Sequence, residues 1–473
     1  MSILDNIYHR SPVIVQQAMV ATYGLFWYRR RYNSHFHKLV SEFKSRDYWT
    51  LDEFRQYQEQ KLKSLFFSAR SSAYYGRVFQ RAGLDLEDAP FENLSKLPLL
   101  SKEMLRTNPA ELLTVPTTPR NTVVFKSSGT TGTPTEIYYS PEFHALELAV
   151  PAARNLAWAD IDYRQRRVMF GVRKVCRYDQ SKPPFWRYSP VENMAYASIY
   201  HLSLHNLPEY MAFLRKYRPA IVMGYPNSLL ILANYAAEND DFPAPAQGIF
   251  TTSETVTAQI RKALEATWKC KIYDRYGAVE NCLFASECEY GRYHVSSDVG
   301  IVEILNDSNE PCSLGEMGQV VCTGLHNHLQ PLIRYQIGDM ARWALDQTCL
   351  CGRKMPILEC IEGRFEDVCY TPDGRQMLRF DTVFKGVDSI REAQVIQNEI
   401  NRFVIRLVPT GGFGEQDIEK LHHNMRLHVG NVMLDIEQVP FIERTPSGKF
   451  RAVVCNLSED SKKIASSGSN SLG

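Results

Sequence analysis

The segment best suited to chemistry in this sequence is a loop rich in serine, threonine and glycine at residues 126–135, KSSGTTGTPT. It directly follows residues 121–125, NTVVF, which have the composition of a β-strand. Hydroxyl groups and unhindered backbone N–H groups at this density can surround the oxygens of a phosphate. The GxxxxGK(S/T) pattern of a Walker A motif is missing, so the loop alone is equally consistent with an ordinary connection.

Two clusters of soft ligands indicate a second kind of chemistry. Cys288 and His294 lie in NCLFASECEYGRYH with five residues between them, and Cys349 and Cys351 lie in TCLCG with one residue between them. Thiolate and imidazole groups form tetrahedral zinc sites when a fold brings such clusters together. The spacing departs from ordinary CxxC pairs, and Cys282 is an alternative ligand. The alternative to a metal site is a set of buried free cysteines that pack as small hydrophobic residues.

The elements that must position these groups change along the chain. Residues 1–95 are predicted to be mostly helical, because apolar residues recur at steps of three and four in residues 51–83, with Gly83 as the expected C-cap. From about residue 120, short β-branched runs alternate with longer helical stretches, which is typical of α/β architecture. After residues 363–367, short strands around one or two helices predict a small α+β unit.

Composition restricts the class of protein. Of the 473 residues, 44% are hydrophobic and 23% charged, which excludes a disordered or fibrous chain. Lys and Arg total 54 against 53 Asp and Glu, so charge gives no reason to expect a nucleic-acid partner. No apolar run reaches about 18 residues, so no membrane-spanning helix is predicted. The sequence has eleven cysteines, and its N-terminus does not resemble a secretory signal. Both observations favour a reduced, cytoplasmic setting.

One segment is nevertheless suited to the surface of a membrane. Residues 13–27, VIVQQAMVATYGLFW, precede a basic and aromatic run at residues 28–38, YRRRYNSHFHK. This order is consistent with an interfacial helix that rests on the anionic inner face of a membrane, which would make the protein peripheral there. The alternative is a helix packed on the body of the protein, followed by a solvated basic turn.

Five further segments follow the loop in a specific order along the chain. They are FTTSETVT at residues 250–257, YDRYGAVE at 273–280, LIRYQIGD at 332–339, IEGRFED at 361–367 and TPSGKF at 445–450. Together with the loop, they resemble the adenylate-forming superfamily of acyl-CoA synthetases. The loop ending in Thr135 and MGYPNSLLILA at residues 223–233 resemble the phenylacetate–CoA ligase branch. The first eighty-odd residues also resemble ligase homologues of capsule and exopolysaccharide loci.

One departure from the superfamily lies in the loop itself. Many members end this loop with Pro-Lys, whereas here Thr135 follows the proline. The departure fits the phenylacetate-type branch, but it removes one cation from the phosphate site.

The resemblance implies an α/β fold with a large multi-subdomain N-terminal adenylate-forming body and a small mobile α+β C-terminal domain. The expected units are a helical N-terminal segment, an α/β nucleotide- and acyl-binding body, an α+β C-terminal cap and a disordered tail, at residues 1–95, 96–363, 364–456 and 457–473. Some phenylacetate-ligase-like proteins carry a Cys/His/Cys/Cys zinc site in this region. The resemblance therefore favours Cys288, His294, Cys349 and Cys351 as zinc ligands.

The resemblance also implies roles in binding the nucleotide. In the phosphate loop, the expected donors are Ser127, Ser128, Gly129, Thr130, Thr131 and Gly132, with Thr130 also counted as catalytic. Glu280 is expected to bind magnesium, and Asp339 to bind the ribose. Tyr276 is expected to stack near the adenine, with Gly277 leaving room for the ligand. The other side of the nucleotide is expected to be lined by Ser253, Glu254 and Thr255. Magnesium prefers a carboxylate together with water ligands, which suits Glu280.

Two basic residues are expected to act near the hinge and from the cap. Lys449 matches the mobile lysine of the family, whose ammonium group would lie between the attacking carboxylate and the α-phosphate and stabilise the transition state. Arg364 resembles an arginine that contacts ribose or phosphate near a hinge at residues 366–367. An ion pair with Glu362 or Glu366 is the alternative for Arg364. The family swings its cap between two poses.

These assignments predict an ATP-dependent, AMP-forming acid ligase that converts a carboxylic acid to an acyl-adenylate and transfers the acyl group to coenzyme A. Alternatives are transfer to an amine, which would give an amide in polysaccharide biosynthesis, and adenylation only. The non-enzyme alternative is an inactive nucleotide-binding scaffold, although the charged groups listed above argue against it. Expected cofactors are ATP and magnesium, with coenzyme A and a structural zinc in addition.

Overall fold

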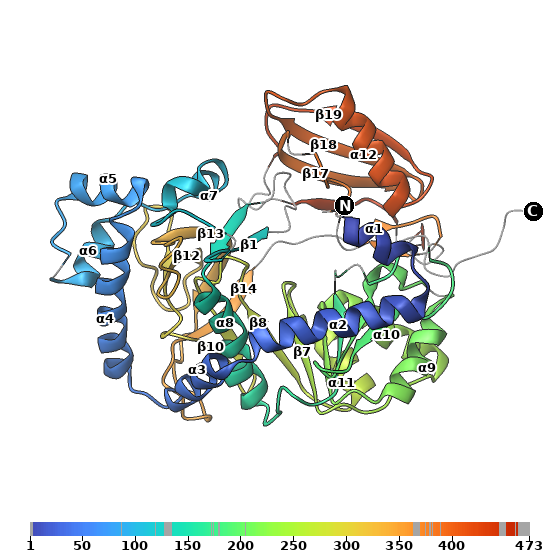
Figure 1. Ribbon diagram of the computed structural model, residues 1–473, viewed down its shortest axis with the longest axis horizontal. Coiled ribbons are helices and arrows are strands. Elements are labelled where there is room, and N and C mark those ends of the chain that lie inside the picture. The colour runs from blue at the N-terminus through green and yellow to red at the C-terminus, as the bar shows by residue number, and fades with distance from the viewer. Residues whose placement is uncertain are drawn as a thin grey trace, which may run out of the picture.

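Two sheets organise the chain: a twelve-stranded mixed sheet in the larger part and a four-stranded sheet near the C-terminus (Figure 1). The computed structural model describes residues 3–461 apart from residues 87, 119, 127–134, 172, 174, 178–179, 204, 363–368, 374, 378–379, 381, 388, 444–450 and 459. The predicted α/β class, with a large body and a smaller α+β C-terminal unit, is confirmed. The domain boundaries at residues 95, 363 and 456 stay predictions.

Helices precede the first strand, as predicted. They are α1 (Ile3–Arg10), α2 (Val13–Arg31), α3 (Ser34–Ser45), α4 (Leu51–Ala69), α5 (Ala73–Ala82), α6 (Pro90–Lys96), α7 (Lys102–Thr107) and the short η1 (Pro109–Leu112). Helix α4 begins with a reciprocal capping box, because the Thr50 hydroxyl accepts from the Glu53 N–H and the Glu53 carboxylate accepts from the Thr50 N–H. Helix α5 ends at Gly83 with φ of 59°, as expected for a C-cap glycine.

The parallel half of the large sheet has its helices in the connections between strands. Strands β5, β3, β6, β7 and β8 lie in that order and run parallel. Their bounds are β3 (Arg167–Gly171), β5 (Met194–Ser198), β6 (Ile221–Gly224), β7 (Gly248–Thr252) and β8 (Ile272–Tyr276). The connections contain η3 (Ile199–His201), α9 (Leu207–Tyr217), α10 (Pro226–Asn239) and α11 (Ala258–Trp268). Strand β4 (Trp186–Ser189) pairs antiparallel with β5 and forms the edge of the sheet.

The sheet changes direction immediately after β8. Strand β9 (Ala285–Glu287) pairs antiparallel with β8 and begins a second, antiparallel half. This half continues through β10 (Tyr293–Val295), β14 (Ile357–Glu362), β13 (Tyr335–Trp343), β12 (Gly318–Gly324) and β11 (Gly300–Leu305). The segment between β8 and β9 therefore leaves the carboxyl end of a parallel strand, where α/β sheets commonly bind ligands.

A hairpin and a modified helix lie against the sheet. Strands β1 (Val123–Lys126) and β2 (Glu136–Tyr139) pair antiparallel, and helix α8 (Pro141–Val150) follows them. Helix α8 continues into a single wide turn, η2 (Pro151–Leu156), which has π-helical geometry. Pro151 has no N–H to donate, and its ring would clash with the carbonyl four residues earlier, which accounts for the wider turn.

The wide turn presents a fully buried arginine. Arg154 donates to both oxygens of Asp298, with Nη1–Oδ1 and Nη2–Oδ2 distances of 2.5 and 3.0 Å, and its Nε donates to Asp47 at 3.3 Å. The Trp158 indole N–H donates to the other oxygen of Asp47 at 3.0 Å. The network connects η2 to the turn after α3 and to the segment before β11.

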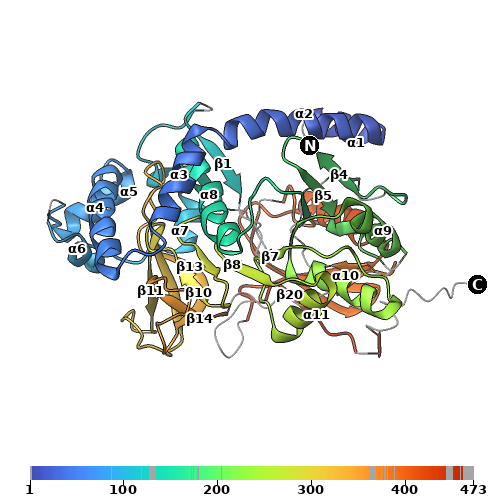
Figure 2. The same cartoon turned by 90° about the horizontal axis from the view of Figure 1, so that it is seen from below.

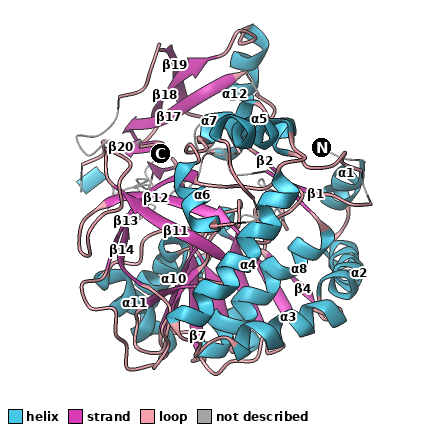
Figure 3. Ribbon diagram, turned by 90° about the vertical axis from the view of Figure 1, so that its left-hand side faces the viewer, coloured by secondary structure: helices cyan, strands magenta, loops and turns pink. Residues whose placement is uncertain are grey.

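The C-terminal unit has its own sheet and its own core. Its sheet has the order β19-β18-β17-β20, with bounds β17 (Ile390–Glu399), β18 (Arg402–Pro409), β19 (Met433–Gln438) and β20 (Val453–Cys455). Helix α12 (Glu415–His428) packs on this sheet through a core that includes Leu421, Met425 and Phe403. A short hairpin of β15 (Cys369–Tyr370) and β16 (Gln376–Met377) precedes it. Figures 1 and 3 show this sheet above the larger body.

Candidate active site and metal cluster

Two of the predicted nucleotide motifs meet directly after strand β8. The hydroxyl of Tyr276, the last residue of β8, donates to Asp339 Oδ2 at 2.9 Å. Asp339 lies on β13, which is separated from β8 in the sheet by β14, β10 and β9. The contact therefore depends on the curvature of the sheet and not on direct strand pairing. It brings the predicted adenine neighbour and the predicted ribose acceptor together.

The predicted magnesium ligand lies beside this pair. Glu280 is only 3% exposed, and its Oε1 accepts a hydrogen bond from the Tyr335 hydroxyl at 2.8 Å. Tyr335 begins β13, the strand that carries Asp339. Among the described residues, Tyr335 is the hydrogen-bond donor to this carboxylate. A buried carboxylate needs a cation or several donors to remain charged, so a bound divalent cation would complete the site.

Tyr335 was not assigned a role by the sequence, although it lies within the motif LIRYQIGD. Burial, and then the Glu280 carboxylate beside it, raise the pKa of the Tyr335 phenol well above its ordinary value. The phenol therefore stays protonated and serves as a fixed hydrogen-bond donor to Glu280. Its position within the motif, four residues before Asp339, could have indicated a role. The orientation of its side chain toward Glu280, however, depends on the packing of β13.

The glycine of the same motif has room around it. A Cβ atom added to Gly277 would meet only the carbonyl oxygen of Leu283, at 3.6 Å, among the described atoms within 4 Å. Its φ does not lie in the left-handed region. Neither packing nor backbone conformation in the described structure requires glycine here. The expected role of Gly277 in giving clearance beside the adenine stays a prediction.

The segment after β7 has a structural function that the sequence did not indicate. Glu254 Oε2 accepts from the backbone N–H of Asn227 at 3.0 Å and from its side-chain amide at 3.2 Å. Asn227 lies in the first turn of α10, so the carboxylate interacts favourably with the helix N-terminus. Ser253 and Thr255 are exposed on either side, and Ser253 has a positive φ of 71°. The predicted nucleotide contacts of these three residues stay predictions.

Several predicted residues lie outside the described residues. They are Ser127, Ser128, Gly129, Thr130, Thr131 and Gly132 of the phosphate loop, Arg364 near the hinge and Lys449 of the cap.

The residues that flank the phosphate loop belong to the described structure. Lys126 Nζ lies 3.0 Å from Glu136 Oε1 across the hairpin of β1 and β2, and the hydroxyl of Tyr139 donates to the carbonyl of Val279, next to Glu280. The hairpin that flanks the loop thus contacts the chain next to Glu280 through Tyr139.

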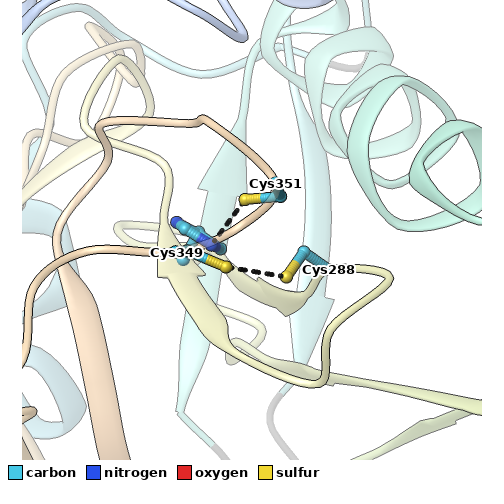
Figure 4. Close-up of side chains that lie close together, drawn as sticks. Cys288, Cys349 and Cys351 are labelled. Carbon is cyan, nitrogen blue, oxygen red and sulfur yellow. Dashed lines mark hydrogen bonds between the residues drawn. The ribbon is translucent and has the colours of Figure 1, made fainter.

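The four predicted zinc ligands lie together. Their ligand atoms are all within 4.8 Å of one another, with 3.7 Å between the sulfurs of Cys288 and Cys349 and 3.3 Å between Cys351 Sγ and His294 Nε2 (Figure 4). A tetrahedral zinc with Zn–S bonds of about 2.3 Å places two sulfurs about 3.8 Å apart. The spacing fits that geometry, and it is too long for a disulfide.

The surroundings of the cluster also suit a metal. His294 Nδ1 lies 3.2 Å from the Met355 carbonyl, an arrangement that directs Nε2 toward the cysteines. The Tyr290 backbone N–H donates to Cys288 Sγ at 3.4 Å. Burial lowers the pKa of His294 to about 4, so its imidazole is neutral, as a ligand requires. Burial also raises the pKa of Cys288 to about 12, so without a metal its thiol stays protonated. Cys282, the alternative ligand, is not in this group and packs in the main core near Cys322.

Comparisons with known proteins agree with the order of the motifs. Residues 369–456 match the family model of the CapK C-terminal domain. The chain is 24% identical over 468 residues to protein CapK of Staphylococcus aureus, which covers 96% of this chain and all of that protein. It is 26% identical over 329 residues to the phenylacetate-coenzyme A ligase of Thermus thermophilus, which covers 67% of this chain and 72% of that enzyme.

Solved structures extend the comparison to the fold. A 2-hydroxyisobutyryl-CoA ligase, in complex with 2-HIB-AMP and CoA in its thioesterification state, superposes with a TM-score of 0.56 at 20% identity. The match covers 87% of this chain and 91% of that one.

The fold and the motif order therefore define an adenylate-forming ligase at the level of the superfamily. Within this superfamily, the chain is similar to CapK and to the phenylacetate–CoA ligases.

We expect the cysteine–histidine cluster to hold one structural zinc ion. Protein purified without a histidine tag should contain about one zinc per chain by elemental analysis. Cys349→Ser should lose most of this zinc and lower the melting temperature, because it removes a thiolate from the cluster. Cys312→Ser, which changes a cysteine outside the cluster, is the matched control and should retain the metal. Less than about 0.3 zinc per chain in the unmodified protein would contradict the assignment.

Proposed function

We propose that this protein is an ATP-dependent, AMP-forming ligase that converts a carboxylic acid to an acyl-adenylate and then transfers the acyl group to coenzyme A. The observation that carries the proposal is the pair of contacts Tyr276–Asp339 and Tyr335–Glu280. These contacts hold a candidate ribose acceptor and a candidate cation ligand on β13 and in the segment after β8, and Tyr139, four residues after the predicted phosphate loop, donates to the carbonyl of Val279 next to Glu280.

The reaction begins with two anions, so the protein must hold them together and offset their charge. The buried Glu280 carboxylate is the residue that would hold magnesium, and a bound magnesium would neutralise phosphate charge. Asp339 would accept from a ribose hydroxyl while Tyr276 keeps its carboxylate oriented. Lys449 would stabilise the charge that develops at the α-phosphate.

Coenzyme A is the acceptor that the relatives favour. The curated relatives include phenylacetate-coenzyme A ligases, and the solved ligase that superposes on this chain was captured with CoA. The likeness to CapK extends over almost the whole chain. An amine acceptor, which the capsule-locus resemblance of the sequence suggests, is the second candidate. Hydroxylamine trapping in the absence of coenzyme A, followed by parallel assays with coenzyme A and with amines, separates the two acceptors.

We expect Lys449→Ala to stall adenylation. Acid-dependent exchange between pyrophosphate and ATP should fall by about 100-fold or more, because the charge at the α-phosphate loses its stabilising cation. Nucleotide affinity should change by less than about threefold, since the lysine acts mainly in the transition state. The matched control is Lys420→Ala, which removes an exposed lysine of α12 that pairs with Asp417, and it should behave as the unmodified protein.

Two results would contradict parts of this account. Unchanged exchange in the Lys449→Ala protein would remove Lys449 from the reaction. Binding of ATP without exchange for any acid in a broad panel would favour the inactive scaffold over the ligase.

We also propose that helix α2 rests on an anionic membrane surface. Its inner side is polar, since Gln17 exchanges two hydrogen bonds with the backbone of Tyr188 on edge strand β4. Its outer side is apolar, with Ile14 78% exposed and Phe26 61% exposed. Figure 2 shows α1 and α2 along one side of the molecule. Among the described residues, no helix is long and apolar enough to cross a membrane.

The basic residues near this face favour anionic lipids, because Arg29 is exposed on α2 and Lys38 is 72% exposed on α3. Sedimentation with phosphatidylglycerol vesicles should bring down the protein, and phosphatidylcholine vesicles should not. The double change Ile14→Gln and Phe26→Gln should reduce binding by about tenfold or more. Phe67→Gln changes an equally exposed aromatic residue on α4 and serves as the control. Absence of binding to anionic vesicles would refute the proposal.

A further inference from the structure

A group of charged side chains lies next to the adenylation residues, and the proposed reaction leaves it without a function. It consists of three arginines and two glutamates: Arg31 on α2, Arg173 after β3, Arg275 on β8, Glu147 on α8 and Glu192 between β4 and β5. The electrostatic neighbours of Glu147 are the three arginines. Arg275 has Asp274, its neighbour on β8, as a further acidic group acting on it.

Four of these side chains have partners of their own. Arg31 Nη1 lies 4.0 Å from Glu192 Oε1, and the Tyr196 hydroxyl donates to Glu192 Oε2 at 2.8 Å. The guanidinium of Arg173 lies over the Tyr196 ring at 4.5 Å. Glu147 Oε2 lies 3.8 Å from the Nε2 of His144 on the same helix.

Arg275 differs from the other two arginines. Among the described residues, no carboxylate lies within 4.0 Å of its guanidinium group, and no hydrogen bond reaches that group. It is half-buried, and burial lowers its pKa although the nearby Glu147 acts in the opposite direction. A guanidinium in the protein interior is stable when an anion or several acceptors satisfy its donors. Arg275 is therefore prepared to receive an anion that does not come from the described protein.

Arg275 lies at the end of β8, one residue before Tyr276. Consecutive side chains of a strand point to opposite faces, and Arg275 has Glu147 of α8 as its first electrostatic neighbour. Helix α8, which carries Glu147, begins immediately after the hairpin that holds the phosphate loop. The ring centroid of His144 lies 5.2 Å from that of Phe125, next to the start of the loop. If the reacting carboxylate lies near Glu280, an acid that extends toward α8 and the end of β8 would bring its far end to Arg275.

We propose that Arg275 binds a second anionic group of the acid. The substrate class is then a carboxylic acid that carries a further carboxylate, phosphate or sulfate group, and Arg31 and Arg173 add to the positive field around it. This inference rests on the proposed ligase function and specifies its substrate. The site would be unsuited to an acid without a second anionic group, such as phenylacetate, because the Arg275 guanidinium would then be covered without a partner.

The first experiment measures pyrophosphate exchange with acids matched in size. The pairs are phenylacetate with 4-carboxyphenylacetate, hexanoate with adipate, and butyrate with 3-phosphonopropionate. We expect kcat/KM for the doubly anionic member to exceed that of its partner by about 10- to 100-fold in at least one pair. The carboxylate and phosphonate pairs distinguish the kinds of second anion.

The second experiment changes Arg275 itself. Arg275→Gln should reduce the ratio of the two kcat/KM values to about one, and Arg275→Lys should give an intermediate ratio because it keeps the charge but not the planar donor pair. Arg164→Gln is the matched control, since Arg164 is exposed and pairs with the neighbouring Asp162. Thermal melting of each variant establishes that it is folded.

The outcomes separate this inference from the proposed function. Exchange that is supported best by the singly charged acids would overturn the inference and leave the ligase function intact. Exchange with no acid at all would instead contradict the ligase function. In that case, the binding of 4-carboxyphenylacetate measured by calorimetry still tests the role of Arg275. Equal affinity in the unmodified and Arg275→Gln proteins would overturn the inference as well.

Discussion

The buried ion pair between Arg154 and Asp298 is the interaction on which the geometry of the body depends. Both side chains are fully buried, and the guanidinium reaches both carboxylate oxygens while its Nε donates to Asp47. Removing one partner of such a network costs about 3–5 kcal/mol, because the other charge remains buried. The arginine is available at this position because Pro151 opens the helix into a wide turn. The network joins η2, which continues α8, to the segments that carry Asp47 and Asp298.

The same interactions continue into the cysteine–histidine cluster. Trp158, which donates to Asp47, lies with its ring centroid 5.9 Å from that of His294, and the Arg353 guanidinium lies over its indole at 4.3 Å. Glu280 precedes the segment that supplies the first two cluster residues, Cys288 and His294. A structural metal would therefore restrict the chain directly after the buried carboxylate. Rigidity at this point matters because positioning of charged groups is the main requirement of adenylation.

The sequence predicted the parts of the site that belong to compact motifs. Tyr276 and Asp339 were expected at one nucleotide, and they form a hydrogen bond. The cluster residues were also identified in advance. The contact of Tyr335 with Glu280 and the proximity of Arg275 to Glu147 were not predicted, because they join residues far apart in the chain whose directions are set by packing. The identity of the substrate acid depends on contacts of this kind between distant residues. A motif can therefore indicate the class of reaction but not the acid.

The central claim is that the acid is activated by attack of its carboxylate on the α-phosphate of ATP. Incubation with ATP, coenzyme A and an accepted acid labelled with ¹⁸O in its carboxylate tests this directly, with the nucleotide product analysed by mass spectrometry. The account predicts one labelled oxygen in AMP, because the acyl–oxygen bond of the adenylate breaks when the acceptor attacks the carbonyl carbon. Label in inorganic phosphate together with ADP, or unlabelled AMP, would contradict it.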